Sequence, residues 1–220
     1  MHIGIILDGN RRYAKKMMMQ PWKGHEEGAR KIEELLGWMK ELKINEITLY
    51  CFSTENFSRE NKEVEFLMKL FKREFAKLES DERLKKDGVR VNFIGKKEML
   101  EGELQEIMKR IEDKTRENRD YTVNFAVAYG GRLEILNAAK KLSESGEEFS
   151  GENLRKNLWL KEDLDLIIRP GGEKRTSNFF PWQSAYSEWI FFDKMWPEFT
   201  KEDLKKAIKE FQARERRFGK

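Results

Sequence analysis

The amino-acid sequence predicts an α/β fold in a single domain, with a mainly parallel central sheet flanked by helices. Short aliphatic segments typical of buried strands alternate with longer segments of helical periodicity along the whole chain. That alternation is typical of parallel sheets, because a helix then connects each strand to the next. No Pro/Gly/Ser-rich linker, internal repeat or low-complexity tract interrupts the 220 residues, so we expect one domain over 1–220.

The elements follow from the period of the apolar residues. Six segments have the length and the β-branched or aromatic content of buried strands, at 2–7, 47–52, 89–94, 123–128, 164–168 and 189–192. Four segments have the period of amphipathic helices, at 26–42, 62–78, 98–117 and 132–142. A last helix begins after Thr200, which caps it with Asp203 at the third helical position.

The helix over 62–78 has an unusually wide apolar face. Besides a regular apolar stripe, it carries Phe66, Met68 and Leu70. A helix that is buried on two sides would show this pattern. One wall of a hydrophobic cleft that holds an apolar ligand tail would show it too, so the sequence leaves both interpretations open.

Composition excludes several classes of protein. Aromatic residues make up 12% of the chain, which excludes a disordered protein. Cys51 is the one cysteine, so an internal disulfide and a multi-thiolate zinc site are excluded. No apolar run approaches the roughly 18 residues of a membrane span, and we expect a cytoplasmic protein. Lys and Arg number 44 against 40 Asp and Glu, and this net charge of +4 is too small to indicate a nucleic-acid partner.

Polar residues follow four of the predicted strands. In a parallel sheet the active site usually lies beyond the carboxyl ends of the strands. The segments at those ends are 8–12, 53–56, 129–132 and 169–178. They combine glycines and arginines with a few carboxylates, which is the composition of a site for phosphorylated ligands.

Asp8 follows three aliphatic residues and precedes Gly9 and Asn10. A carboxylate at a strand end, beside a glycine that admits close approach, suits Mg²⁺ bound jointly by protein and phosphate. An aspartate in this position is equally common as a helix N-cap or in a turn. If Gly9 and Asn10 lead into a helix, their N–H groups are available to an anion, and Arg11 and Arg12 add positive charge.

The segment 53–59 has two interpretations. Ser53 and Asn56 have the spacing of a capping box, which would be ordinary turn chemistry. Alternatively, the segment is a polar surface that orients a reacting group, with Arg59 on a phosphate.

The segment 169–178 is the most informative. Two arginines, a lysine and a Gly-Gly pair fall within the seven residues from Arg169 to Arg175. The glycine amides can form a nest for an anion, and arginine binds phosphate through a bidentate fork. Ser177 can donate one more hydrogen bond. A purely structural loop rarely needs this combination, so we expect a phosphate-binding loop.

Two further residues are ambiguous. Glu188 lies just before an aromatic strand, where it is either a second metal contact or an ordinary charge at a strand edge. His25 lies near a helix start, and a single histidine is more often structural than catalytic. The chain lacks the G-x-x-x-x-G-K-[ST], G-x-G-x-x-G and G-x-S-x-G motifs and an Asp-Asp-x-x-Asp cluster.

Taken together, these segments resemble the cis-prenyltransferase family, which includes undecaprenyl diphosphate synthase. The matching stretches are 7–16, 24–28, 49–59, 129–132, 165–179 and 214–219. The resemblance implies a tunnel for the growing prenyl tail and the sequential condensation of isopentenyl diphosphate onto an allylic diphosphate, either farnesyl or geranylgeranyl diphosphate. The implied product is a long-chain, undecaprenyl-like diphosphate that is delivered to the membrane as a carrier-lipid precursor. The implied cofactor is Mg²⁺, the implied assembly is a homodimer, and no nucleic acid is expected.

The resemblance also assigns roles to individual residues. It implies catalytic roles for Asp8 and Asn56, and a metal site formed by Asp8 and Glu188. The residues implied for the allylic diphosphate are Gly9, Asn10, Arg11, Arg12, Tyr13, His25, Phe57 and Arg59. Those implied for isopentenyl diphosphate are Ser53, Thr54, Glu55, Arg169, Arg175, Thr176, Ser177, Arg217 and Gly219, the last two in a C-terminal R-x-G motif that crosses a dimer interface in the family.

The sequence departs from the family pattern at a few positions. Arg11 replaces a usual glycine, Tyr13 and Phe57 replace tryptophans, and Pro170 stands where threonine is common. Pro21 stands where the family usually has an arginine on the diphosphate, and Lys23 or Arg11 are the candidates to compensate.

Two other classes compete with an active enzyme. A non-catalytic subunit of the same fold would be expected to lack Asp8, which is present together with the R-x-G motif. A phosphate-binding regulator or RNA binder would not need Asp8, Asn56 and a wide apolar helix together.

Overall fold

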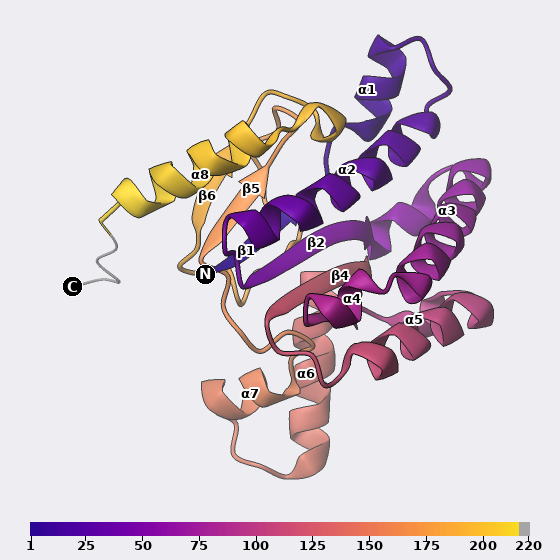
Figure 1. Ribbon diagram of the computed structural model, residues 1–220. Helices are drawn as coiled ribbons and strands as arrows, with labels where there is room; N and C mark the ends of the chain where they lie inside the picture. Colours follow the sequence, from indigo (N-terminus) through magenta and orange to yellow (C-terminus); the bar gives the residue numbers. More distant parts are fainter. Residues whose placement is uncertain (216–220) are drawn as a thin grey trace.

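The structure is a computed structural model, and it describes residues 1–215. Six strands form one sheet in the order β3-β4-β2-β1-β5-β6, and every pair of neighbours is parallel (Figure 1). The strands are β1 (His2–Ile6), β2 (Glu46–Ser53), β3 (Val89–Ile94), β4 (Tyr121–Tyr129), β5 (Leu166–Arg169) and β6 (Glu188–Phe191). All six predicted strands are confirmed, and so is the α/β fold.

Helices connect the strands, as the sequence predicts. The α-helices are α1 (Asn10–Lys16), α2 (Lys23–Glu41), α3 (Asn61–Ser80), α4 (Arg83–Lys86), α5 (Gly102–Thr115), α6 (Gly131–Ser145), α7 (Gly151–Asn157) and α8 (Lys201–Ala213). Short 3₁₀ helices are η1 (Thr54–Ser58), η2 (Lys97–Met99) and η3 (Trp196–Glu198). The helix predicted over 98–117 is divided in two, because Leu100 and Glu101 have extended backbone between η2 and α5. Thr200 caps α8 as expected, since its side chain accepts a hydrogen bond from the N–H of Asp203.

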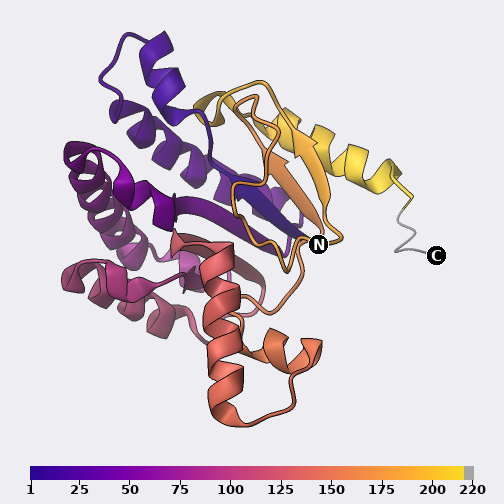
Figure 2. The same cartoon turned by 180° about the vertical axis from the view of Figure 1, so that it is seen from behind.

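The side chains of each strand alternate between two apolar layers. Ile3, Ile5 and Leu49 belong to the larger layer, which α2, α3, α5 and α8 cover (Figure 1). Ile6 and Tyr50 point the other way, into a smaller layer closed by the segment from Leu158 to Phe180. Helix α6 lies on that second side and stands in front of the sheet in Figure 2. Two covered faces explain why the strands read as continuous apolar runs.

A polar ladder crosses the second face of the sheet. His2 Nε2 lies 2.7 Å from Thr48 Oγ1, and the amide of Asn124 donates to the same hydroxyl over 3.0 Å. Asn92 donates to Asn124 over 2.8 Å, which extends the ladder to β3. Burial of His2, which is 6% exposed, lowers its pKa to about 4, so that the folded protein holds a neutral imidazole there.

The order of the strands determines where a ligand can bind. The chain leaves β1 towards β2 on one side, whereas β5, the other neighbour of β1, leads to β6 on the opposite side. In open α/β sheets, ligands bind in the crevice beyond the carboxyl ends of two such strands. Asp8 lies just beyond β1 and Arg169 ends β5, so both flank this crevice.

Candidate active site

The structure brings the four polar segments together at the carboxyl edge of the sheet. Arg169 at the end of β5 contacts Asp8 after β1, although 161 residues separate them. Asn178 donates to Glu55 after β2 over 2.8 Å and accepts from the N–H of Arg132 at the start of α6 over 2.9 Å. The four segments therefore lie together at one edge of the sheet, and their role as one site stays a prediction.

The ion pair between Asp8 and Arg169 is the centre of the site. Arg169 Nη2 donates to Asp8 Oδ2 over 2.8 Å, and the Arg169 side chain is only 3% exposed. Asp8 Oδ1 accepts from the N–H of Gly9 over 2.6 Å and from Arg12 Nη2 over 3.2 Å. Burial raises the pKa of Asp8, but the hydrogen bond and charge of Arg169, followed by those of Arg12 and Gly9, outweigh it and lower that pKa below its ordinary value. Asp8 is therefore a carboxylate that keeps its charge at neutral pH, and its side chain remains 26% exposed.

Two glycines allow the backbone to approach this pair closely. Gly9 has φ +98°, and a Cβ there would lie 2.8 Å from Met195 Cβ. Gly171 has φ +102°, and a Cβ there would lie 3.0 Å from Arg12 Nη2 and 3.2 Å from Asp8 Cβ. A side chain at either position would be strained and would displace the groups that hold Asp8.

The loop after β5 is held in an uncommon conformation by Arg169. Ser177 and Asn178 both have positive φ, 50° and 62°. Arg169 Nη1 donates to Ser177 Oγ over 2.7 Å and also to the carbonyl of Arg175. Left-handed non-glycine residues persist only where their surroundings hold them, and they cluster at ligand sites. The Arg175 side chain extends outward, where it is 61% exposed and pairs with Glu173, and Thr176 next to it is exposed.

The segment after β2 shows the capping interaction that the sequence offers as one of two interpretations. Asn56 Oδ1 accepts from the N–H of Ser53 over 3.0 Å, so the capping interaction is present. The same turn carries Thr54 and Glu55 into the site, where Thr54 donates to Glu55 over 3.0 Å. Phe57 instead packs edge-on against Phe52 at 4.9 Å between ring centroids, which places it in the apolar layer.

Glu63 is a central residue that the sequence analysis did not single out. It is 5% exposed, and its carboxylate lies 2.9 Å from Arg59 Nη1, 3.4 Å from His25 Nε2 and 3.6 Å from Arg11 Nη1. The hydrogen bond from His25 lowers the pKa of Glu63, burial opposes it, and the charges of Arg59 and Arg11 lower it further, below its ordinary value. Glu63 thus joins three basic residues, from α1, α2 and the end of η1. Its position four residues after Arg59 was the available signal.

The remaining positions lie as follows. Asn10 opens α1 and donates to the carbonyl of Leu7 over 2.9 Å, and Tyr13 lies half-buried on the same helix. Pro21 lies in the turn between α1 and α2. Lys23, one candidate to compensate for it, pairs with Glu26 over 3.1 Å.

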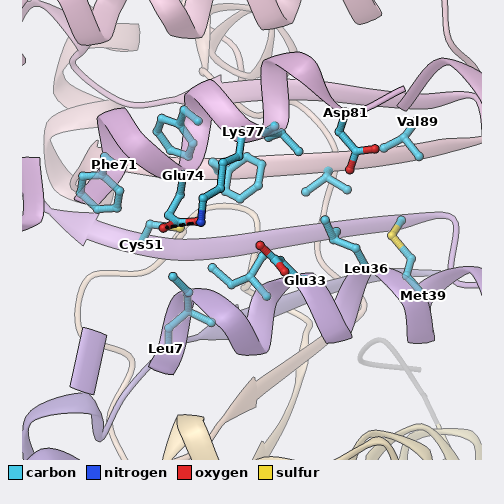
Figure 3. Close-up of a pocket in the computed structure, with 18 of the residues that line it drawn as sticks. Leu7, Glu33, Leu36, Met39, Cys51, Phe71, Glu74, Lys77, Asp81 and Val89 are labelled. Atoms are coloured by element: carbon cyan, nitrogen blue, oxygen red, sulfur yellow. Dashed lines mark hydrogen bonds and ion pairs between the residues drawn. The ribbon is translucent and has the colours of Figure 1, made fainter. Parts of the chain in front are cut away.

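A cavity of about 490 Å³ adjoins the site between α2 and α3. Asn10 and His25 line the end next to the site, and the lining continues to Asp81 beyond the last turn of α3. Figure 3 shows Leu36 and Met39 from α2 and Phe71 from α3 on opposite sides of this space. The wide apolar face of α3 serves two surfaces, because part of it lines the cavity and part of it packs against α5.

The residues that could hold a metal are few. In residues 1–215 no group of three or more His, Cys, Asp or Glu side chains is arranged to hold a metal ion. Glu188 begins β6 in register with Leu166, at the amino end of the sheet, and accepts from Arg214 over 2.5 Å. Within one chain, therefore, the predicted metal pair of Asp8 and Glu188 does not come together. Asp8 lies beyond the carboxyl end of β1, whereas Glu188 lies at the amino end of β6, and the strands of the sheet are parallel. Arg217 and Gly219 of the C-terminal motif lie outside the described residues.

The fold and this geometry define a class of protein: a parallel α/β domain with an arginine-rich polar site beside an apolar cavity. The model of the undecaprenyl diphosphate synthase family matches residues 6–219. The chain belongs to this family of cis-type prenyltransferases.

Relatives and solved structures agree with this assignment. A tritrans,polycis-undecaprenyl-diphosphate synthase (geranylgeranyl-diphosphate specific) of Pyrococcus horikoshii is 48% identical, over 100% of this chain and 86% of that protein. An isoprenyl transferase of Thermus thermophilus is 44% identical, over 100% of this chain and 88% of that protein. The crystal structure of a probable undecaprenyl diphosphate synthase from Campylobacter jejuni has a TM-score of 0.86 at 36% identity, covering 100% and 98% of the two chains. Lavandulyl diphosphate synthase from Lavandula x intermedia, solved with dimethylallyl diphosphate, has a TM-score of 0.91 at 31% identity, with the same coverage.

Within the part of the chain that the structure describes, no helix is both long and apolar enough to cross a bilayer.

Proposed function

We propose that this chain condenses isopentenyl diphosphate repeatedly onto an allylic diphosphate primer and makes a long-chain polyprenyl diphosphate. One observation carries the proposal: the Asp8–Arg169 pair stands at the crevice of the sheet, beside an apolar cavity of about 490 Å³. A diphosphate needs the first feature and a prenyl tail needs the second. The Pyrococcus relative is named as specific for geranylgeranyl diphosphate, so that primer is the first to test and farnesyl diphosphate the second.

The allylic diphosphate would bind above the start of α1. Gly9, whose N–H donates to Asp8, precedes the first turn of α1, and we assign the diphosphate to the free N–H groups of that turn and to Arg11 and Arg12 on it. Glu63 contacts Arg59 and His25, and His25 lines the cavity, so the tail of the primer would enter past His25. In the reaction the allylic carbon–oxygen bond breaks and the diphosphate leaves with the electron pair. Arginines fixed around the leaving group stabilise the charge that develops there.

The donor set fits Mg²⁺ at Asp8. This ion is commonly bound in proteins by one or two carboxylates together with substrate phosphates and water, and Asp8 is charged and 26% exposed. When bound, Mg²⁺ would supply neutralisation of the leaving diphosphate.

Isopentenyl diphosphate would bind on the loop after β5. Arg169 is already oriented by Asp8 and Ser177, and Arg175 and Thr176 are exposed beside it. The double bond of isopentenyl diphosphate attacks the allylic carbon, a carbon–carbon bond forms, and a proton is lost from the isopentenyl unit. Asn56 keeps its Nδ2 group available, because its Oδ1 atom accepts from Ser53, and we assign to it the orientation of the reacting unit.

A homodimer completes the proposal. Glu188 can share a metal with Asp8 only if it comes from a second copy of the chain, since one chain places the two at opposite ends of the sheet. Arg214, which pairs with Glu188, is three residues before Arg217 of the C-terminal motif that the family resemblance assigns to the dimer interface. A cytoplasmic location and delivery of the product to a membrane belong to the same proposal.

The experiment is the incorporation of labelled isopentenyl diphosphate by the purified protein, with the products sized by chromatography. We expect products of many isoprene units with geranylgeranyl or farnesyl diphosphate as primer. Tight binding of a primer without any incorporation would favour a non-catalytic subunit of the same fold and would contradict the proposal.

A further inference from the structure

The turn between α1 and α2 exposes an apolar cluster. Its sequence from 17 to 22 is Met-Met-Met-Gln-Pro-Trp, and Met17 and Met18 are 51% and 96% exposed. Met18 has φ 55°, which turns the chain sharply after α1. The turn lies at the periphery of the molecule, beyond the ends of the two helices (Figure 1). Other exposed large apolar residues among those described, such as Leu136 and Phe149, are not neighbours in the sequence as Met17 and Met18 are.

The same segment carries a concentrated positive charge. Residues 9–25 contain five Lys and Arg and no Asp or Glu, a net charge of +5, against +4 for the whole chain. The remaining residues therefore sum to −1. Lys15 makes no side-chain ion pair with any described residue. Lys16 pairs with Glu198 and Lys23 with Glu26, yet their side chains remain 58% and 50% exposed.

A hollow joins the two features. Arg11, Arg12 and Lys15 line it together with Met18, Met19 and Pro21, and its volume is about 530 Å³. Arg11 and Arg12 contact Glu63, Asp8 and Glu173 and belong to the proposed allylic-diphosphate site, so the hollow itself adds Lys15 and two thioethers to the turn. The lysines and the exposed methionines of the turn are matched by phosphate groups attached to an apolar body. An anionic phospholipid surface offers both at once, since its headgroups are charged and its acyl chains begin just below them.

We infer that the Met17–Lys23 turn, with Lys15 and Lys16 beside it, docks the enzyme onto an anionic membrane surface. The exposed methionines enter the interface and the basic residues contact the headgroups. The turn lies next to the segment that starts the diphosphate site, so a docked enzyme holds the mouth of its cavity near the bilayer. Use of this contact for product delivery rests on the proposed function, whereas docking itself does not.

The test is sedimentation of the purified full chain with vesicles, without substrates. Vesicles of 70% phosphatidylcholine and 30% phosphatidylglycerol are compared with vesicles of phosphatidylcholine alone. We expect binding to the anionic vesicles that weakens in 0.5 M salt, because screening shortens the range of the attraction. M17S/M18S should lower the partition coefficient at least about fivefold, since two apolar side chains no longer enter the interface. K15Q/K16Q should lower it about fivefold for each charge removed.

Controls and contrary outcomes are defined in the same assay. L136S and F149S remove apolar side chains elsewhere that are each 68% exposed, and they should leave binding unchanged. M17S/M18S should retain the circular dichroism and the turnover of the wild type. The inference is overturned if the wild type ignores anionic vesicles, if M17S/M18S binds as the wild type does, or if light scattering shows that the methionines mediate self-association while lipid binding is unaltered. Because no substrate is present, loss of docking and loss of enzyme activity are separate results.

Discussion

Replacing Asp8 with asparagine removes the charge at the centre of the site while it keeps the size of the side chain. Arg169 then loses its counter-charge, although it is 3% exposed and its Nε atom is already buried without a partner. Breaking a fully buried ion pair costs about 3–5 kcal/mol. Asp8 is 26% exposed and the asparagine oxygen still accepts from Arg169, so we expect a smaller loss, about 1–3 kcal/mol of unfolding free energy.

The same substitution should also lower the turnover rate, as a separate effect from the loss of unfolding free energy. Loss of one preorganised electrostatic contact costs roughly 10²-fold or more in rate, which is about 2.7 kcal/mol. Asp8→Ala should have an effect at least as large. The assay combines Mg²⁺-dependent incorporation of labelled isopentenyl diphosphate with chemical denaturation of the same preparations.

A matched control separates the two effects. Asp163 pairs with Arg155 over 2.8 Å, and it is 59% exposed. Asp163→Asn should change stability by less than about 0.5 kcal/mol and leave turnover unchanged. If Asp8→Asn folds and turns over within about threefold of the wild type, the role assigned to Asp8 is refuted.

Three further predictions concern the surroundings of the site. Glu63→Gln should raise the KM for the primer about tenfold with kcat changed less than threefold, since a charge-assisted contact with Arg59 is lost. Glu65→Gln, at an exposed position on the same helix, is the control. Equal effects of the two substitutions on KM would contradict the role of Glu63. Leu36→Trp should fill part of the cavity and shorten the products on chromatography, and an unchanged length distribution would exclude a tail in that cavity. Folding lowers the pKa of His2 from 6.5 to about 4, so the unfolded chain binds a proton there before the folded protein does. The free energy of unfolding should therefore fall by up to about 3 kcal/mol as the pH drops from 6.5 to 4. Urea titrations at both pH values should show a smaller fall for His2→Gln, and an equal fall would refute this account.

Most of the fold could be predicted from the sequence, because strands covered on both faces leave continuous apolar runs. Helices shorter than two turns, such as α4 and α7, could not, since four to seven residues carry too little periodicity. The break between η2 and α5 was missed because Leu100 and Glu101 suit a helix and only the local backbone departs from it.

The site was predictable where glycines and arginines share one segment, as around Asp8 and Arg169. Glu63 was missed because its importance comes from burial among bases of three elements, which only the tertiary structure brings together. The position of Glu188 just before its strand was available from the sequence, whereas its pairing with Asp8 on one metal came from the family resemblance. Which end of the sheet a residue reaches depends on where its strand begins, and Glu188 is the first residue of β6.

The central claim is that the Asp8–Arg169 site and the adjoining cavity together extend a prenyl chain. Its most direct measurement is the incorporation of labelled isopentenyl diphosphate by the purified wild type, with geranylgeranyl diphosphate as primer, in Mg²⁺ and in EDTA. The account predicts a ladder of lengthening polyprenyl diphosphates in Mg²⁺ and none in EDTA. Absence of incorporation in Mg²⁺ with both geranylgeranyl and farnesyl diphosphate, by a folded protein, would contradict it.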